Sequence, residues 1–121
     1  MTQIYDPKLD KWSSGAEIPV GVASAAAVAT VGDAAPKAVY VVGGLILALN
    51  ETGSGYVYNP QDLIQVYFPE NDSWVAGAAI PMARYAISVA AVDDRLYVLG
   101  GSDSRTSPYI ATNELYFPLG Y

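Results

Sequence analysis

The sequence contains no cysteine and no histidine. Without cysteine there are no disulfide bonds, and cysteine usage cannot report on the redox compartment. Zinc, copper and haem sites that depend on thiolate or imidazole ligands cannot be built from this chain alone. A Ser–His–Asp or Cys–His nucleophile is excluded for the same reason. We therefore expect no metal, no cofactor and no catalytic residue.

Basic residues are also scarce. The chain has six Lys and Arg against twelve Asp and Glu, which gives a formal net charge of −6. The six basic residues are scattered from Lys8 to Arg105, whereas nucleic-acid binding needs clustered cations to displace counterions from phosphates. Nucleic acid and anionic membrane surfaces are therefore not expected as partners.

Long apolar runs are absent as well. The longest, at residues 38–49, is interrupted by Gly43-Gly44 and is shorter than the roughly 20 residues that span a bilayer, so no membrane insertion is predicted. No basic region followed by an apolar region opens the chain. The repeat described next predicts that residue 1 lies inside a strand, so the lack of a signal-peptide pattern says little about localisation.

An internal repeat is present. Residues 5–12 (YDPKLDKW) and 67–74 (YFPENDSW) share Tyr, Pro and Trp at identical spacing, and the match continues into 15–19 (GAEIP) and 77–81 (GAAIP). The period in this register is about 60 residues. Proline cannot donate a ladder hydrogen bond, so it predicts the end of each tyrosine-bearing strand.

A second pair of matching segments ends in two glycines. Residues 39–44 (VYVVGG) match 96–101 (LYVLGG), and a third tyrosine segment, ELYFP, lies at 114–118. Continuous β-formers bounded by glycine are typical of strands buried on both faces. Asp93 and Asp94, between two apolar runs, predict a hairpin turn and not a catalytic pair.

The order of these elements resembles the kelch repeat, whose period is about 50 residues. The resemblance covers essentially the whole chain and implies an all-β fold: kelch-type β-propeller blades of four antiparallel strands, named a to d from the central channel outward. It implies strands c–d of one blade at 1–19, a complete blade at 20–81 and strands a–c of the next at 82–121, about nine strands in all.

Slightly more than two blades fall short of the four to eight that propellers typically have. Either the chain is a segment of a longer polypeptide, or several copies self-associate, for example three copies closing a ring of about six blades. We favour the segment because the sequence begins within a predicted strand.

The alanine-rich stretch 23–30 favours helix by intrinsic propensity, so helix is a competing interpretation there. Strand is preferred because its counterpart, 86–92, is rich in β-formers. Small side chains also suit the innermost strand of a blade.

The repeated glycines and aromatics are expected to be structural. Glycine permits close backbone approach or positive φ, and the aromatics fill the space between blades. These residues are Gly43, Gly44, Gly100, Gly101, Tyr5, Tyr67, Trp12 and Trp74.

Candidate ligand-binding residues lie in loops, where propeller function is usually placed. The b–c connection at 45–63 is rich in Tyr, Gly, Ser and Asn, a composition suited to adaptable recognition, and tyrosine faces can stack on sugars. The competing interpretation is a flexible solvent loop. The candidates in the two b–c connections are Tyr56, Tyr58, Asp103, Arg105 and Tyr109.

Arg84 and Tyr85 precede a predicted strand a in the segment PMARY. The kelch resemblance implies that this arginine lies near the channel mouth and meets an acidic ligand. Val22 stands at the matching place in the first repeat, so the pattern is not kept. A local structural hydrogen bond or salt bridge is the alternative.

Asn50 and Asn71 fit the N-glycosylation sequon, which matters only if the protein is exported. A secreted or cell-surface glycoprotein is the localisation that this favours, although the sequence does not determine the compartment. No acidic cluster has calcium-loop spacing.

The sequence predicts a non-catalytic binding module that recognises a protein or carbohydrate through its b–c and d–a loops. Two alternatives stay open. One is a structural protein whose blades associate into a closed ring or filament, and the other is an enzyme completed by blades outside this chain.

Overall fold

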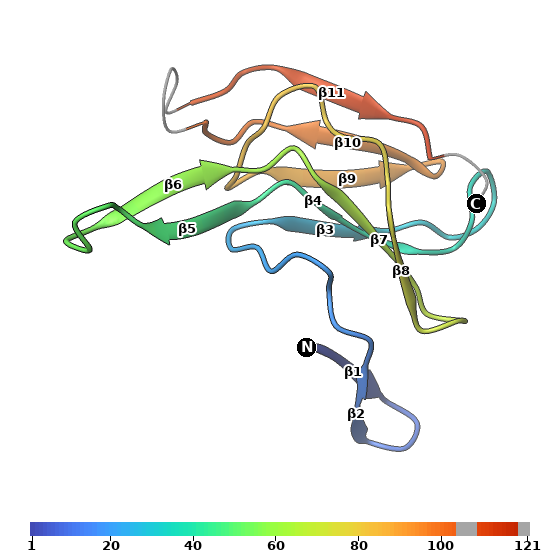
Figure 1. The fold of residues 1–121 in the computed structure, drawn as a ribbon. Helices are drawn as coiled ribbons and strands as arrows, with labels where there is room; N and C mark the ends of the chain where they lie inside the picture. The colour runs from blue at the N-terminus through green and yellow to red at the C-terminus, as the bar shows by residue number, and fades with distance from the viewer. Residues whose placement is uncertain (104–108, 119–121) are drawn as a thin grey trace.

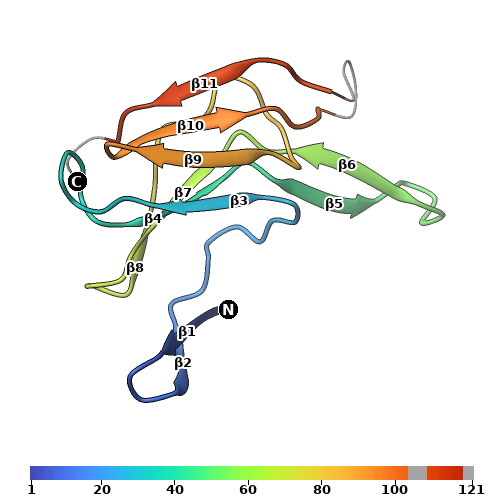
Figure 2. The same cartoon turned by 180° about the vertical axis from the view of Figure 1, so that it is seen from behind.

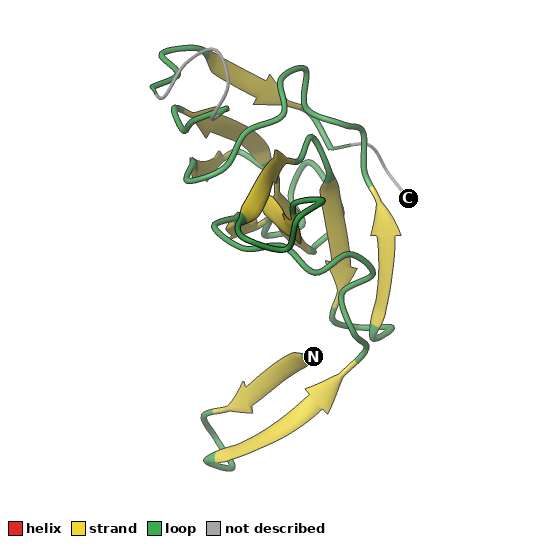
Figure 3. Ribbon diagram, turned by 60° about the vertical axis from the view of Figure 1, so that its left-hand side comes forward, coloured by secondary structure: helices red, strands yellow, loops and turns green. Residues whose placement is uncertain are grey.

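The computed structural model describes residues 1–103 and 109–118. Every regular element in these ranges is a β-strand, and none of their residues is helical. Figures 1 and 3 show strands arranged in successive sheets along the chain. The predicted all-β class with antiparallel sheets is confirmed.

The central sheet has four antiparallel strands in the order β3-β4-β7-β8. They are β3 (Ala26–Ala29), β4 (Val39–Val42), β7 (Ile64–Phe68) and β8 (Ser73–Ala76). Strands β4 and β7 are rich in Val, Ile and Tyr, which suit a pleated, buried surface, and they occupy the middle of the sheet. This is the four-stranded antiparallel unit that the repeat predicted.

Two smaller sheets flank the central one. An N-terminal hairpin pairs β1 (Thr2–Asp6) with β2 (Lys11–Gly15), and a three-stranded sheet has the order β11-β10-β9. Its strands are β9 (Ser88–Val92), β10 (Arg95–Leu99) and β11 (Asn113–Tyr116). Each tyrosine segment forms one strand of its sheet, and each Trp lies on the neighbouring strand.

The helical interpretation of 23–30 is wrong. Strand β3 forms there and β9 forms in the matching segment, and the two strands contact each other. Each also pairs along its length with the Gly-Gly strand of its own sheet. These cross-strand hydrogen bonds outweigh the modest helix propensity of alanine.

An additional hairpin lies where the sequence predicted an irregular loop. Strand β5 (Leu45–Leu49) pairs with β6 (Tyr56–Pro60) in a separate two-stranded sheet. This raises the strands of the described residues to eleven from the predicted nine or so. The β-forming content of LILAL and YVY was visible in the sequence, but the repeat pattern had assigned the segment to a connection. Figures 1 and 2 show the hairpin projecting beyond the other sheets.

The core lies between the central sheet and the three-stranded sheet. Tyr40, Val42 and Val66 of the first are fully buried, and so are Leu96 and Val98 of the second. Because each sheet buries one face against the other, stacking of adjacent sheets is the main source of apolar burial.

The Gly-Gly pairs have the structural role that was expected. Gly43 has φ 60° and Gly44 has φ 105°, in the region that favours glycine. A Cβ on Gly43 would lie 2.5 Å from the carbonyl oxygen of Arg84, in the segment that leads to the next sheet. The pair therefore allows neighbouring sheets to approach at the backbone.

Candidate interaction surface

A Tyr–Asp–Trp set fastens the central sheet to the preceding hairpin. The Tyr67 hydroxyl donates to Asp72 Oδ1 at 2.8 Å, and the same oxygen accepts the Ala16 N–H at 2.7 Å. The Trp74 Nε1–H donates to the Ala16 carbonyl at 3.0 Å. The Ala16 N–H, with help from the Tyr67 hydroxyl, lowers the pKa of Asp72. Both backbone groups of Ala16 are thus bound by one neighbouring sheet.

The same set recurs in the N-terminal hairpin with an open outer side. The Tyr5 hydroxyl donates to Asp10 Oδ1 at 2.6 Å, and the rings of Tyr5 and Trp12 are 5.1 Å apart at 41°. Those ring values are identical in the central sheet. Trp12 is nevertheless 70% exposed, because in the described part of the chain no segment occupies the place that Ala16 takes. The repeated aspartate was visible in the alignment, but its role was not recognised.

Asp94 forms a second connection between sheets. Its carboxylate accepts the backbone N–H groups of Val31, Gly32, Ala34 and Ala35, at 2.7 to 3.2 Å. These bonds, that of Ala34 first, lower the pKa of Asp94 from 3.8 to about 2. The β9–β10 turn therefore holds the β3–β4 loop of the adjacent sheet. Anion binding by successive backbone amides is a common nest geometry.

The prediction of a turn at Asp93 and Asp94 is confirmed. Both residues have positive φ, 51° and 58°, as a two-residue hairpin turn requires. Asp94 is committed to backbone amides, which is a structural role.

Arg84 is completely buried. Its Nη1 donates to the carbonyls of Gly100 at 2.9 Å and Thr112 at 2.8 Å, and its Nη2 lies 3.0 Å from Glu114 Oε1. Its backbone carbonyl accepts the N–H of Gly44, between β4 and β5. These contacts correspond to the structural alternative that the sequence left open, and all of them lie between segments of the chain itself.

The two repeats differ not only at Arg84 and Val22 but also at a second position, which contacts the same region of each repeat. Glu114 occupies the place in its repeat that Gln65 occupies in the first, and Gln65 instead exchanges two hydrogen bonds with the backbone of Val20. Arginine thus accompanies glutamate in one repeat, and valine accompanies glutamine in the other. Alignment of these two positions was the signal that could have predicted the ion pair.

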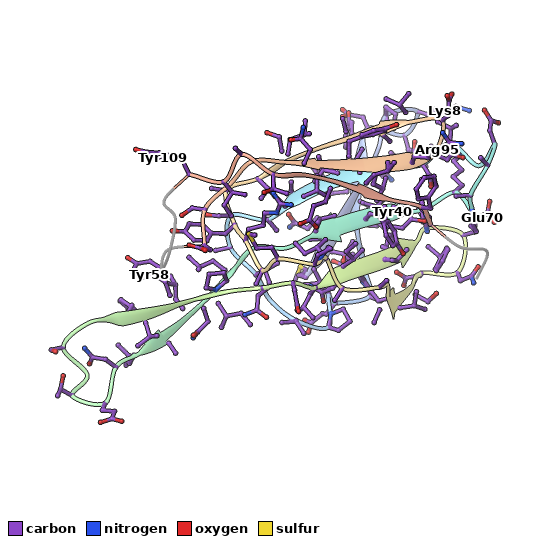
Figure 4. All side chains as sticks on the ribbon, turned by 90° about the horizontal axis from the view of Figure 1, so that it is seen from above. Lys8, Tyr40, Tyr58, Glu70, Arg95 and Tyr109 are labelled. Atoms are coloured by element: carbon purple, nitrogen blue, oxygen red, sulfur yellow. The ribbon has the colours of Figure 1, made fainter. Side chains whose placement is uncertain are left out.

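The remaining candidates cluster at one end of the sheets. Tyr85 forms an isolated antiparallel bridge with Ser102, the residue before Asp103 in the sequence. Tyr109 is 86% exposed. Tyr58 and Tyr109 lie at the end of the molecule opposite Lys8 and Arg95 (Figure 4). Arg105 lies outside the described residues.

The β5–β6 hairpin carries exposed apolar side chains on one face. Leu47 stands opposite Tyr58, and Leu49 stands opposite Tyr56. Their exposed fractions range from 46% for Leu47 to 62% for Leu49 and Tyr56. Clustered exposed apolar side chains are typical of interaction surfaces. Two predicted candidates, Tyr56 and Tyr58, thus lie side by side with leucines that the sequence analysis had not singled out.

The sequon asparagines lie in turns. Asn50 Oδ1 accepts the Ser54 N–H at 3.0 Å, so its side chain helps to close the β5–β6 turn. Asn71 is exposed in the β7–β8 turn. Glycosylation at either residue stays a prediction.

An apolar cavity of about 520 Å³ lies between the N-terminal hairpin and the central sheet. Ile4 and Tyr5 line it from one side, and Val39, Tyr67 and Trp74 line it from the other. Because its walls belong to two adjacent sheets, this cavity is space between blades. Within residues 1–103 and 109–118, no three Asp or Glu side chains gather as a metal site would require.

Comparison with known proteins identifies the repeat. The sequence profile of the kelch motif matches residues 83–116, which comprise the buried arginine and the three-stranded sheet. Residues 83–116 thus match one kelch motif, and this match together with the Kelch-like relatives supports a kelch-repeat fragment of a propeller. The human Kelch-like protein 28 is 34% identical over 74 residues, which cover 61% of this chain and 11% of that protein.

Longer alignments are found with two other proteins. Mouse Kelch-like protein 35 is 28% identical over 105 residues, or 87% of this chain and 16% of that protein. Beta-scruin of Limulus polyphemus is 28% identical over 100 residues, or 83% of this chain and 10% of that protein. The chain thus spans between about a tenth and a sixth of the length of these relatives. In the described ranges, no helix has the length and apolar character needed to cross a membrane.

Proposed function

We propose that this chain is a non-catalytic interaction module of a kelch propeller and that it binds a protein partner at the end where the β5–β6 hairpin projects. Kelch-repeat proteins generally serve as interaction modules, and the similarity to Kelch-like proteins supports this role. In this proposal residues 1–19, 20–81 and 82–121 contribute to three successive blades.

One observation carries the proposal. The β5–β6 hairpin is much longer than a turn between strands b and c requires, and it presents Leu47, Leu49, Tyr56 and Tyr58 to solvent. Exposing these side chains costs free energy that burial against a partner would recover, at about 25 cal/mol per Å² of apolar surface. Aromatic residues in such a cluster are frequent anchors at protein interfaces.

Display of random peptides, run in parallel with a glycan array, tests the class of ligand. We expect the purified chain to enrich peptides that compete with one another and to retain no glycan. Retention of glycans with no peptide enrichment would instead assign carbohydrate binding to the tyrosine-bearing hairpin.

An assembly role is the second candidate, and the open Tyr5–Asp10–Trp12 set favours it. Its counterpart binds both backbone groups of Ala16, so the open set is shaped to receive an equivalent segment of another blade. Light scattering of the purified chain tests this role. A mass that is a multiple of 12.8 kDa, lost in a Trp12→Ala variant, would support assembly, and a monomer at all concentrations would refute it.

A further inference from the structure

The β5–β6 hairpin offers an open strand edge as well as an apolar face. In antiparallel pairs, residues alternate between those bonded to the partner strand and those whose N–H and C=O point away from it. Asn50 N–H donates to Gly55, and Gln61 N–H donates to Gly44, which identifies the even-numbered residues of β5 as the ones bonded to β6. The backbone groups of Leu47 and Leu49 therefore point to the outer edge.

The start of that outer edge is already paired. Leu45, also odd-numbered, exchanges two hydrogen bonds with Ala23, at 2.8 and 2.9 Å, in an isolated antiparallel bridge. If the pairing continued, Gly21 would stand opposite Leu47, but the bridge is confined to one pair, and a Cβ built on Gly21 meets nothing within 4 Å. Among residues 1–103 and 109–118, the chain begins a third strand beside β5 and leaves the rest of the edge open.

Natural proteins usually protect such edges with charges, proline or bulges. Strand β5, with the sequence LILAL, has none of these. From residue 38 to residue 83 the chain contains no Lys or Arg, and its charged residues are Glu51, Asp62, Glu70 and Asp72. The open edge is thus apolar. Glu51 lies in the turn that follows β5 and Asp62 just after β6, so an acidic residue stands near each end of the hairpin, whereas Glu70 lies at the end of the molecule opposite Tyr58 (Figure 4).

We propose that the outer edge of β5 binds an extended segment of a partner protein by strand addition, in line with Ala23. The segment has an apolar residue at every second position, which packs beside Leu47 and Leu49. Basic residues at its flanks complement Glu51 and Asp62. Main-chain hydrogen bonds supply affinity in this mode, and alternate side chains supply specificity. This inference rests on the proposed protein-binding function.

A defined peptide tests the inference directly. The probe is a fluorescently labelled peptide of sequence KKVTVTVK, compared with the same peptide N-methylated on alternate amides and with an EEVTVTVE version, in fluorescence anisotropy titrations of the full chain. Strand addition predicts that N-methylation and charge reversal each weaken binding by at least about tenfold, because the first removes edge hydrogen bonds and the second opposes the charge of the chain. Equal binding of the methylated peptide would overturn the inference.

A matched pair of variants locates the site. Leu49 and Leu9 are similarly exposed, at 62% and 67%, but Leu9 lies in the distant β1–β2 turn. We expect Leu49→Lys to abolish peptide binding and Leu9→Lys to leave it unchanged, while both variants keep the wild-type unfolding midpoint. If display-selected peptides bind the Leu49→Lys variant as well as the wild type, the edge is not the site, although the protein-binding function stands.

Two further outcomes separate the alternatives. If no peptide binds in either the titration or the display, the protein-binding function fails together with the inference. If the free chain is a dimer that Leu49→Lys dissociates, a second copy of the chain occupies the edge, and the inference of a partner segment is wrong.

Discussion

Replacement of Arg84 by the valine of the first repeat is the sharpest test of how the sheets are joined. Arg84→Val removes the donor to the carbonyls of Gly100 and Thr112 and the cation beside Glu114. Arg84 has no exposed surface, and the Glu114 side chain is 13% exposed, so water cannot replace these interactions without rearrangement. Removing one partner of a buried ion pair typically costs about 3–5 kcal/mol. That is a large part of a total stability of about 5–15 kcal/mol.

The first repeat provides the matched control. It combines Val22 with Gln65 where the second combines Arg84 with Glu114. The double variant Arg84→Val/Glu114→Gln recreates that neutral pair, so no unpaired carboxylate is left in the interior. We expect the double variant to be more stable than Arg84→Val by at least about 1 kcal/mol, within the usual range for residues in direct contact.

Urea unfolding followed by tryptophan fluorescence measures both variants, since the chain has two tryptophans. A loss of less than about 1 kcal/mol for Arg84→Val would refute the structural role. A double variant that is less stable than Arg84→Val would show that the charge of Glu114 is not what makes the single substitution costly.

Three other substitutions probe the connections between sheets. The lowered pKa of Asp94, about 2 against 3.8, means that its carboxylate stabilises the fold above about pH 4 and loses that effect as the pH falls toward about 2. The urea midpoint of Asp94→Asn should therefore fall less than that of the wild type on acidification, and parallel decreases would contradict this. Trp74→Phe removes the hydrogen bond to the Ala16 carbonyl and should lower the free energy of urea unfolding by about 1 kcal/mol, whereas Trp12→Phe should cost nothing measurable. Equal losses of stability would refute a stabilising role for the Trp74–Ala16 hydrogen bond. Gly43→Ala should lower the thermal midpoint more than Gly53→Ala, because both glycines have positive φ but only the first faces a carbonyl at 2.5 Å; the reverse order would disprove the close approach.

Most of the fold could be predicted from local sequence patterns. The tyrosine and Gly-Gly segments predicted strands because β-formers bounded by glycine or proline leave few other options. The Asp93-Asp94 turn was predicted because aspartate tolerates positive φ. The alanine-rich segment was ambiguous, since helix propensity and repeat alignment disagreed there and cross-strand pairing decided for β3. The β5–β6 hairpin was missed, because the repeat pattern had assigned its residues to a connection.

Less of the candidate site could be predicted from the sequence. Tyr56 and Tyr58 were predicted from composition, but the ladder that places them beside Leu47 and Leu49 depends on register, and a shift of one residue would reverse the faces. For Arg84 the resemblance implied an acidic ligand, and a local structural hydrogen bond or salt bridge was the alternative. The paired difference between the repeats could have indicated its ion pair with Glu114, but its complete burial follows from contacts between segments far apart in the chain.

The sequence by itself determined the repeat, the hairpin turn at Asp93 and Asp94, and the strands other than β5 and β6, because these depend on the chemistry of neighbouring residues. Tertiary structure alone decided which backbone groups Asp94, Trp74 and Arg84 bind and which strand edge stays open. Those outcomes depend on how one sheet stacks on the next, and stacking brings together atoms whose separation along the chain carries no local signal.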